Sequence, residues 1–254
     1  MLKRIAHYIV NKLGYDLVKP DKRLVVDGLP ADFDKSTVDT YNLVKQYTMT
    51  SPERIASLIN AVNYLVKNDI QGDIVECGVW RGGSTMAAID SLIKAGDTTR
   101  EVYLYDTFEG MSEPSEYDKE FTGTAASDLS KNLNNEGPES KWCYSALEEV
   151  ENNIASLNYP AKLIHYVKGK VEETIPATIP SKIALLRLDT DWYESTAHEL
   201  EYLYPLLVPG GVIIIDDYGH WEGARKAVDE YIAGNKLPLL LNRIDYTGRI
   251  GVKY

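Results

Sequence analysis

From residue 51 onward, short apolar runs rich in β-forming residues alternate with longer segments in which apolar residues recur at helical spacing. This alternation is typical of a parallel sheet whose strands are connected by helices. Ser51, Pro52 and Glu53 favour the start of the first helix, which is predicted to run to about residue 66. Apolar runs that predict strands lie at residues 73–77, 101–105, 163–167, 183–188 and 212–215.

The C-terminal stretch LPLLLNRIDYTGRIGVKY departs from this rhythm. It holds two β-like runs separated by DYTG, residues 245–248. Two strands joined by so short a turn pair in antiparallel fashion. With the five strands before them, they predict an α/β fold with a seven-stranded, mainly parallel sheet and a C-terminal antiparallel hairpin.

Two regions lie outside the alternation. Residues 1–50 are predicted to form a helical arm, because apolar residues recur at helical spacing at Leu2, Ile5, Ile9 and Leu13. Such a helix docks on a partner subunit or lies on a membrane surface. Residues 51–254 form the main domain, and within it the polar insertion 110–142 has a length typical of a lid, a binding loop or a disordered segment.

Composition narrows the class of protein. With 254 residues and 44% hydrophobic content, the chain can bury a full core. Its net charge of −11 argues against nucleic-acid binding, which needs a basic surface, and no apolar stretch approaches the roughly 20 residues that span a bilayer. Cys77 and Cys143 lack metal-ligand spacing, so we expect a cytoplasmic protein that binds small molecules.

The turn after the first strand reads VECGVWRGGSTMAA and is rich in glycine. Glycines let the backbone approach a ligand, and the following helix N-terminus offers free N–H groups. Dinucleotide, nucleotide and S-adenosylmethionine sites all use such a turn. Glu76 accepts a hydrogen bond from an amine or hydroxyl but opposes a pyrophosphate, which disfavours a dinucleotide. Ser84 and Thr85 are either ligand contacts or plain helix caps.

Asp106 ends the second strand, in YLYDTFEGM. An acidic residue at about this distance from a glycine turn binds the ribose diol in nucleotide sites. The alternative is that Asp106 only begins a turn toward Gly110. An NAD-dependent dehydrogenase would share these features, so the turn and this acid leave the cofactor open.

Four acidic residues follow two later strands: Asp189 and Asp191 in LRLDTDWYEST, then Asp216 and Asp217 in GGVIIIDDYG. Neighbouring parallel strands would bring them together at one sheet edge, where carboxylates without a cation repel each other. Carboxylate oxygens suit a hard divalent cation such as magnesium. Helix capping is the alternative, but it explains both pairs together poorly. His220, after the second pair, is either a substrate contact or a solvated loop histidine.

Taken together, these segments resemble the macrocin O-methyltransferase family, class I S-adenosylmethionine-dependent enzymes with a Rossmann-like fold that methylate sugar hydroxyls on natural products. The resemblance covers roughly residues 40–254. It rests on the motifs YTMTSPERI, GDIVECGVWRGGS, LYDTFEGM, LRLDTDWYEST and LVPGGVIIIDDYG.

The resemblance implies a role for each matching position. The S-adenosylmethionine contacts would be Met49, Thr50, Ser51 and Arg54 over the amino-acid end, Glu76, Gly78, Trp80 and Ser84 around the methionine part, Asp106 on the ribose, and Thr107, Gly169 and Val171 around the adenine. A more distant likeness to catechol-type O-methyltransferases implies magnesium on Asp189, Asp216 and Asp217. Those enzymes place a lysine near this point and none follows here, which fits a carboxylate base, Asp189 or Asp191.

We therefore expect a metal-dependent O-methyltransferase that acts on a hydroxyl of a sugar or glycosylated natural product. A phenol is the alternative acceptor. An NAD-dependent dehydrogenase and a non-catalytic scaffold with the same fold are the alternative functions. The family also implies a homo-oligomer in which N-terminal arms cover neighbouring sites.

Overall fold

The computed structural model describes residues 25, 26, 28–130 and 142–254. The helix predicted from the apolar spacing of residues 2–13 therefore lies outside the described residues. The same is true of residues 131–141 within the predicted lid.

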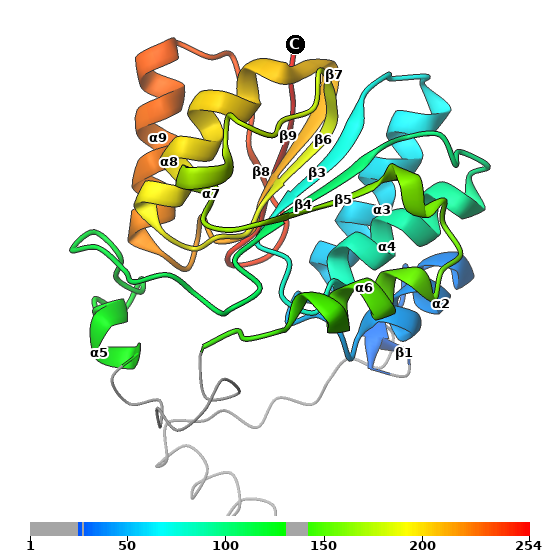
Figure 1. The fold of residues 1–254 in the computed structure, drawn as a ribbon, viewed down its shortest axis with the longest axis horizontal. Coiled ribbons are helices and arrows are strands. Elements are labelled where there is room, and N and C mark those ends of the chain that lie inside the picture. Colours follow the sequence, from blue (N-terminus) through cyan, green and yellow to red (C-terminus); the bar gives the residue numbers. More distant parts are fainter. Residues whose placement is uncertain (1–24, 27, 131–141) are drawn as a thin grey trace, which may run out of the picture.

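A seven-stranded sheet forms the centre of the molecule, in the order β5-β4-β3-β6-β7-β9-β8 (Figure 1). Strands β3 to β7 are parallel, whereas β9 pairs antiparallel with both β7 and β8. This confirms the predicted sheet and its C-terminal hairpin. The strands are β3 Asp73–Cys77, β4 Val102–Asp106, β5 Ile164–Lys168, β6 Ile183–Leu188, β7 Leu207–Ile215, β8 Asn242–Arg243 and β9 Arg249–Val252.

Strand β7 begins at Leu207, earlier than the predicted residue 212. The intervening Pro-Gly-Gly is a poor strand former. It is nevertheless held in the sheet, because the Gly210 N–H donates to the Lys253 carbonyl (2.7 Å) and the Lys253 N–H donates to the Gly211 carbonyl (2.9 Å). Pairing with the C-terminal segment thus overrides the local preference.

Helices cover both faces of the sheet (Figure 1). One face carries α2 Lys35–Val44, α3 Pro52–Lys67, α4 Gly83–Lys94 and α6 Leu147–Ala155, and the other carries α7 Val171–Thr174, α8 Tyr193–Leu203 and α9 Glu222–Asn235. Side chains of β7 alternate between the two cores: Val212 and Ile214 pack into the first, Ile213 and Ile215 into the second. The shorter elements are β1 Val25–Val26, β2 Leu29–Pro30, α5 Ala126–Ser130, η2 Ala161–Leu163 and η3 Tyr204–Leu206.

The predicted start of the first domain helix is confirmed. Ser51 is the N-cap of α3, and its side chain accepts a hydrogen bond from the Arg54 N–H (3.2 Å). The described end of the predicted arm packs on the body, since the Thr40 hydroxyl of α2 donates to Asp90 of α4 (2.6 Å).

The insertion after β4 docks on α8 and α9 over its described part. The buried Asp118 carboxylate accepts hydrogen bonds from the Tyr193 N–H at the start of α8 (2.8 Å) and from the Ser115 N–H (2.6 Å). A Cβ on Gly223 would lie 1.9 Å from this carboxylate. Helix α9 can therefore approach Asp118 only because residue 223 is glycine.

A tryptophan cluster completes this contact. Trp142, Trp192 and Trp221 pack edge to face, with ring centroids 4.9–5.9 Å apart. The Trp192 indole N–H also donates to the Ser112 carbonyl of the insertion (3.0 Å). The insertion is thus joined to the sheet edge by a small apolar core of its own.

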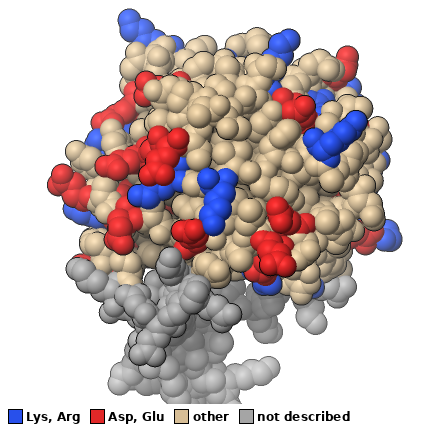
Figure 2. Space-filling model, viewed as in Figure 1, with Lys and Arg blue, Asp and Glu red and all other residues tan. Residues whose placement is uncertain are grey.

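Among the described helices, none has the length and apolar character needed to cross a bilayer. Acidic and basic side chains lie interspersed on the face shown in Figure 2, without a continuous basic surface there.

Candidate active site

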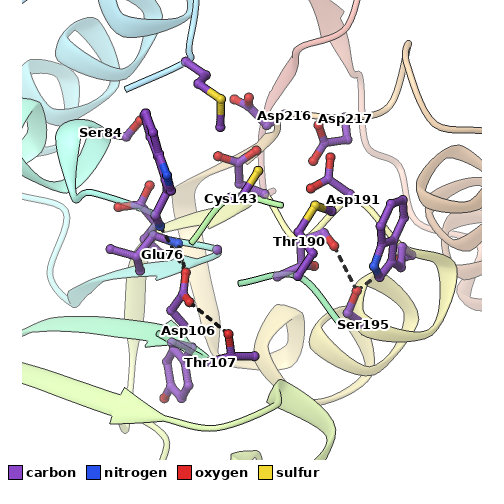
Figure 3. A pocket seen from close by; sticks show the side chains of 18 of the residues that line it. Glu76, Ser84, Asp106, Thr107, Cys143, Thr190, Asp191, Ser195, Asp216 and Asp217 are labelled. Carbon is purple, nitrogen blue, oxygen red and sulfur yellow. Dashed lines mark hydrogen bonds between the residues drawn. The ribbon is translucent and has the colours of Figure 1, made fainter. Parts of the chain in front are cut away.

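A cavity of about 410 Å³ opens where the parallel strands end. In Figure 3, Glu76, Asp106 and Thr107 lie on one side of it, and Asp216 and Asp217 on the other. Ser51 does not line this cavity, but the other fifteen residues predicted for the site do: Met49, Thr50, Arg54, Glu76, Gly78, Trp80, Ser84, Asp106, Thr107, Gly169, Val171, Asp189, Asp191, Asp216 and Asp217. The structure thus brings them together, while their individual roles stay predictions.

The glycine turn after β3 lies against the end of β6. Gly78 has a φ of +83°, and a Cβ there would lie 2.0 Å from the Asp189 carbonyl oxygen. The Asp189 N–H in turn donates to the Cys77 carbonyl (2.8 Å). Only glycine combines this left-handed conformation with such a close approach. The glycine turn after β3 therefore packs directly against the backbone of the loop that carries Asp189.

Ser84 and Thr85 do not cap the next helix. The N-cap of α4 is Gly82, with a φ of +86° and no side-chain hydrogen bond. The Ser84 hydroxyl instead lies 3.4 Å from the Thr50 hydroxyl, and the Thr85 hydroxyl donates to Glu76. Both side chains therefore belong to the polar network of the cavity.

Asp106 organises the glycine turn directly. Its Oδ2 accepts hydrogen bonds from the N–H groups of Val79 (2.7 Å) and Trp80 (3.0 Å), and its Oδ1 accepts one from the Phe108 N–H (2.7 Å). The alternative interpretation, in which Asp106 begins a turn, is therefore partly correct. The Thr107 hydroxyl also lies 3.5 Å from Oδ1 (Figure 3), but it donates at 2.6 Å to the Gly110 carbonyl. A carboxylate has about four acceptor positions, so Oδ1 can still accept from a ligand hydroxyl.

Arg187 is a site residue that we did not predict. Its side chain is 3% exposed, and its guanidinium forms ion pairs with Glu76 (2.5 Å), Asp189 (2.7 Å) and Asp216 (2.8 Å). The available signal was a lone charge within the apolar strand IALLRL. Burial raises the pKa of Glu76 although Arg187 opposes that shift.

Arg54 connects α3 with the acidic edge and the hairpin. It pairs with Asp216 and, through Nε, with Asp245 (3.0 Å). The other Asp245 oxygen accepts hydrogen bonds from the N–H groups of Thr247 (2.9 Å) and Gly248 (2.7 Å), which shapes the hairpin turn. Arg54 therefore lies on the acidic side of the cavity.

Carboxylate oxygens of Asp189, Asp216 and Asp217 all lie within 4.8 Å of one another. The helices that follow, α8 and α9, have Trp192 and Trp221 as their N-cap residues, and neither of these side chains makes a capping hydrogen bond. The interpretation of these acids as helix caps is therefore wrong. Asp118, from the insertion, serves the start of α8 instead.

The charge balance of this edge fits a divalent cation. Five carboxyl groups face two guanidinium groups, which leaves three formal negative charges when all are ionised; the groups are Glu76, Asp189, Asp191, Asp216 and Asp217 against Arg54 and Arg187. Burial, followed by repulsion from neighbouring acids, raises the pKa of Asp217 well above its ordinary value. Hard oxygen donors with uncompensated charge are the donor set that magnesium prefers.

Asp191 lies beside this trio. It has a φ of +67°, and its carboxyl is hydrogen-bonded to that of Asp217. Burial, and then the charge of Asp189, raise the pKa of Asp191 to about 7. In the absence of a cation on the trio, Asp191 is thus close to the protonation equilibrium that suits a general base near neutral pH.

A further buried acid supports the loop between Asp189 and Asp191. Glu199 in α8 is 0% exposed, and its Oε1 accepts a hydrogen bond from the Thr190 hydroxyl (3.0 Å). Burial raises the pKa of Glu199 well above its ordinary value. We did not predict this residue, because an acid within a helix gives no sequence signal for burial.

Comparison with known proteins now decides the family. The family described as macrocin-O-methyltransferase (TylF) matches residues 8–251. The chain belongs to the macrocin O-methyltransferase family. It is accordingly an S-adenosylmethionine-dependent O-methyltransferase, and the dehydrogenase and scaffold alternatives are set aside.

Two curated relatives are also O-methyltransferases by name. One, from Streptomyces olivaceus, is the 8-demethyl-8-(2,3-dimethoxy-alpha-L-rhamnosyl)-tetracenomycin-C 4'-O-methyltransferase, 33% identical over 90% of this chain and 84% of the relative. Another, demethyldecarbamoylnovobiocin O-methyltransferase from Streptomyces niveus, is 31% identical over 80% of this chain and 74% of the relative.

The fold agrees with a solved O-methyltransferase structure as well. The O-methyltransferase NovP superposes with a TM-score of 0.71 at 29% identity, covering 82% of each chain. The class I methyltransferase fold predicted from the sequence is therefore confirmed.

Proposed function

We propose that this protein is a divalent-metal-dependent O-methyltransferase that transfers a methyl group from S-adenosylmethionine to a sugar hydroxyl of a glycosylated natural product. The observation that carries this proposal is the trio Asp189, Asp216 and Asp217, whose carboxylates converge in the same cavity as the glycine turn. The reacting hydroxyl and the methyl donor would therefore meet between the two sides of one cavity.

On the cofactor side, the glycine turn and its neighbours hold the methyl donor. Glu76 lines the cavity. Its Oε1 accepts from Arg187 and its Oε2 accepts from Thr85, which fixes its orientation, and each oxygen has a second acceptor position that would serve the donor's amine. Asp106 holds the N–H groups of the turn through Oδ2, and its Oδ1, which also accepts from the Phe108 N–H, would bind a ribose hydroxyl. Thr107, Gly169 and Val171 line the adenine end, and Met49, Thr50, Trp80 and Ser84 enclose the methionine end.

On the acidic side, Asp189, Asp216 and Asp217 would hold magnesium or another divalent cation. Such a cation would supply charge stabilisation for the developing alkoxide of the acceptor and would orient neighbouring hydroxyls. Arg54 pairs with Oδ2 of Asp216 and Arg187 pairs with Oδ1 (2.8 Å), so the orientation of this carboxylate would be fixed before a cation binds. This preorganisation limits the reorganisation that binding requires.

The proton of the acceptor hydroxyl is assigned to Asp191. Asp189 is paired with Arg187 and belongs to the metal trio, so its carboxylate is already engaged. Asp191 has a left-handed backbone conformation and lines the same cavity outside the trio. The hydroxyl oxygen forms the new bond to the methyl carbon, the sulfonium is released as the neutral thioether, and Asp191 takes the proton.

The sugar acceptor is supported by the names of the relatives, of which one describes methylation at the 4' position of a rhamnosyl-bearing tetracenomycin. A phenol acceptor is the alternative for the same site. A homo-oligomer in the cytoplasm, with N-terminal arms over neighbouring sites, also remains part of this proposal, and light scattering of the full chain tests its oligomeric state.

Three measurements test the proposed function. S-adenosylhomocysteine should raise the melting temperature, and its failure to bind would contradict the cofactor assignment. Exhaustive chelation should abolish methyl transfer and readdition of magnesium should restore it; full activity of the metal-free protein contradicts the metal assignment. Asp191→Asn should lower kcat while preserving Mn²⁺ affinity, whereas Asp189→Asn should weaken Mn²⁺ binding.

A further inference from the structure

A short segment between α2 and α3 forms one wall of the cavity. We define this strap as residues 46–50. Tyr47, Thr48, Met49 and Thr50 of the strap all line the cavity, and Met49 is at the same time 64% exposed. The strap therefore lies between the cavity and solvent.

The inner side of the strap rests on the glycine turn and the start of α4. The Gly83 N–H donates to the Tyr47 carbonyl (3.0 Å), and a Cβ on Gly83 would lie 2.5 Å from that oxygen. At the end of the strap, the Thr50 hydroxyl accepts from Arg187 (3.1 Å) and lies 3.4 Å from the Ser84 hydroxyl. The strap and the turn are thus in direct contact at both backbone and side-chain level.

Arg81 holds the strap from outside the cavity. This residue belongs to the glycine turn, in the motif GVWRGGS, but its side chain does not line the cavity. Its Nη1 donates to the Gln46 carbonyl at the start of the strap (3.0 Å). Its guanidinium also lies over the rings of Tyr47 and Trp80, 5.5 and 5.8 Å from their centroids. One side chain therefore engages the strap through a hydrogen bond and a cation–π contact.

Glu149 of α6 holds the Arg81 guanidinium in place. The Arg81 Nε lies 2.6 Å from one Glu149 oxygen, and the other Glu149 oxygen accepts from the Ser145 hydroxyl (3.1 Å). Asn153, one turn further along α6, donates to the Arg81 carbonyl (2.9 Å). Ser145 is buried and follows the cavity-lining Cys143 by two residues. The Arg81–Glu149 pair thus joins the strap, the glycine turn and the segment after the insertion.

The exposure of this pair indicates a local role. The Arg81 and Glu149 side chains are 36% and 38% exposed, and ion pairs in such positions contribute little to the stability of a whole domain. Their contacts nevertheless converge on segments that line the cavity. Loss of the pair would free the strap without leaving a buried charge, and a ligand that needs the closed strap loses apparent affinity in proportion to the closed fraction.

We propose that Arg81 is a positioning residue that, together with Glu149, holds the strap over the methionine end of S-adenosylmethionine and so determines how long the cofactor stays bound. This inference rests on the proposed function, because the methionine end is assigned there to the strap and the glycine turn. The product S-adenosylhomocysteine occupies the same place, so the strap must be released before the product can leave.

The test measures S-adenosylhomocysteine binding to the full-length protein by calorimetry. Its dissociation is followed by stopped-flow tryptophan fluorescence, for which Trp80 in the cavity wall is a reporter. Arg81→Met removes the charge and the donors, and it should raise the Kd about tenfold, mainly through faster dissociation. Arg81→Lys keeps the charge but not the two-sided donor geometry, so it should raise the Kd only about threefold.

A second substitution assigns the effect to the pair. Glu149→Gln keeps an acceptor for Ser145 but removes the charge that faces Arg81, and it should raise the Kd about three- to fivefold. In the double variant the Kd should stay within about twofold of that of Arg81→Met, because both substitutions remove the same contact. The melting temperature of the cofactor-free single variants should fall by less than about 4 °C.

Lys226→Met is the matched control. Lys226 is 39% exposed, pairs with Glu230 at 3.0 Å and lies over the rings of Tyr117 and Tyr193 at 4.3 and 4.2 Å. It therefore combines an ion pair with ring contacts as Arg81 does, but its partners belong to the insertion, α8 and α9. Lys226→Met should keep the S-adenosylhomocysteine affinity and dissociation rate of the wild type.

The proposal is overturned if Arg81→Met binds S-adenosylhomocysteine within about twofold of the wild type, or if Lys226→Met weakens binding as strongly. It is also overturned if the cofactor-free melting temperature of Arg81→Met falls by more than about 4 °C, since the loss would then be a general one. Failure of the proposed function gives different results. A wild-type protein that does not bind S-adenosylhomocysteine overturns both proposals, whereas a wrong metal or acceptor assignment leaves the effect of Arg81 unchanged.

Discussion

Replacing Arg187 with methionine tests the electrostatic account of the site most directly. The guanidinium is 3% exposed and pairs with Glu76, Asp189 and Asp216 at 2.5–2.8 Å. Methionine fills a similar volume but leaves these acids without their shared cation. Removing one partner of a buried ion pair costs about 3–5 kcal/mol.

For a chain of 254 residues, a loss of that size lowers the melting temperature by roughly 6–20 °C, at about 2–4 °C per kcal/mol. Differential scanning calorimetry in the presence of a chelator measures the shift. Arg225→Met is the matched control, because Arg225 is 62% exposed and its ion pair with Asp229 is 3.8 Å long; it should change stability by less than about 0.5 kcal/mol.

Magnesium should then recover more stability in Arg187→Met than in the wild type, because the cation supplies positive charge that the variant lacks. A melting temperature for Arg187→Met within about 2 °C of the wild type would refute the reasoning, since it would mean that the three acids do not depend on this guanidinium. Equal recovery by magnesium in both proteins would contradict the link between Arg187 and the metal trio.

Three further outcomes are expected. Gly78→Ala should weaken S-adenosylhomocysteine binding at least about tenfold by calorimetry, because its Cβ would lie 2.0 Å from the Asp189 carbonyl oxygen. The control Gly96→Ala, also at positive φ but with open space around it, should keep the affinity. Equal affinities of the two variants would exclude a steric cause. Asp118→Ala should destabilise the protein by about 1–3 kcal/mol in denaturant unfolding through loss of buried hydrogen bonds, and unchanged cleavage of the insertion by protease would contradict its role as an anchor. Burial raises the pKa of Glu199 above its ordinary value of 4.5. At a pH above 4.5 the folded protein therefore binds a proton that the unfolded chain has lost, so the stability of the wild type falls as the pH rises. Glu199→Gln lacks this loss, so its melting temperature relative to wild type should increase from about pH 5 to about pH 8, unlike that of the control Glu201→Gln.

The sheet and the membership of the site could be predicted because both depend on short-range patterns. An apolar run followed by an acid or a glycine marks where a parallel strand ends, and parallel strands end at one edge. That reasoning placed Glu76, Asp106 and Asp216 around one cavity. The start of β7 was misplaced because Leu207 pairs with Ile183 of β6 and because Gly210 and Gly211 are held by Lys253, which lies far along the chain.

The electrostatic partners of the site could not be predicted in the same way. Arg187 appears in the sequence as one charge in a strand, and its three acidic partners come from β3, the loop after β6 and the end of β7. Glu199 and Asp118 resemble ordinary polar residues until the fold buries them. Their roles depend on which segments meet in space, which composition and periodicity do not encode.

The contact between Asp118 and Gly223 has a consequence for engineering. The insertion supplies the hydrogen-bond acceptor for the first N–H of α8, the helix that follows Asp191, and α9 leaves the space in which that acceptor lies. An insertion transplanted from a relative to change acceptor preference must therefore carry an acid at this point and meet a glycine on α9. Exchange of exposed positions in the insertion that contact neither Asp118 nor the tryptophan cluster should be tolerated far better than exchange of the whole segment.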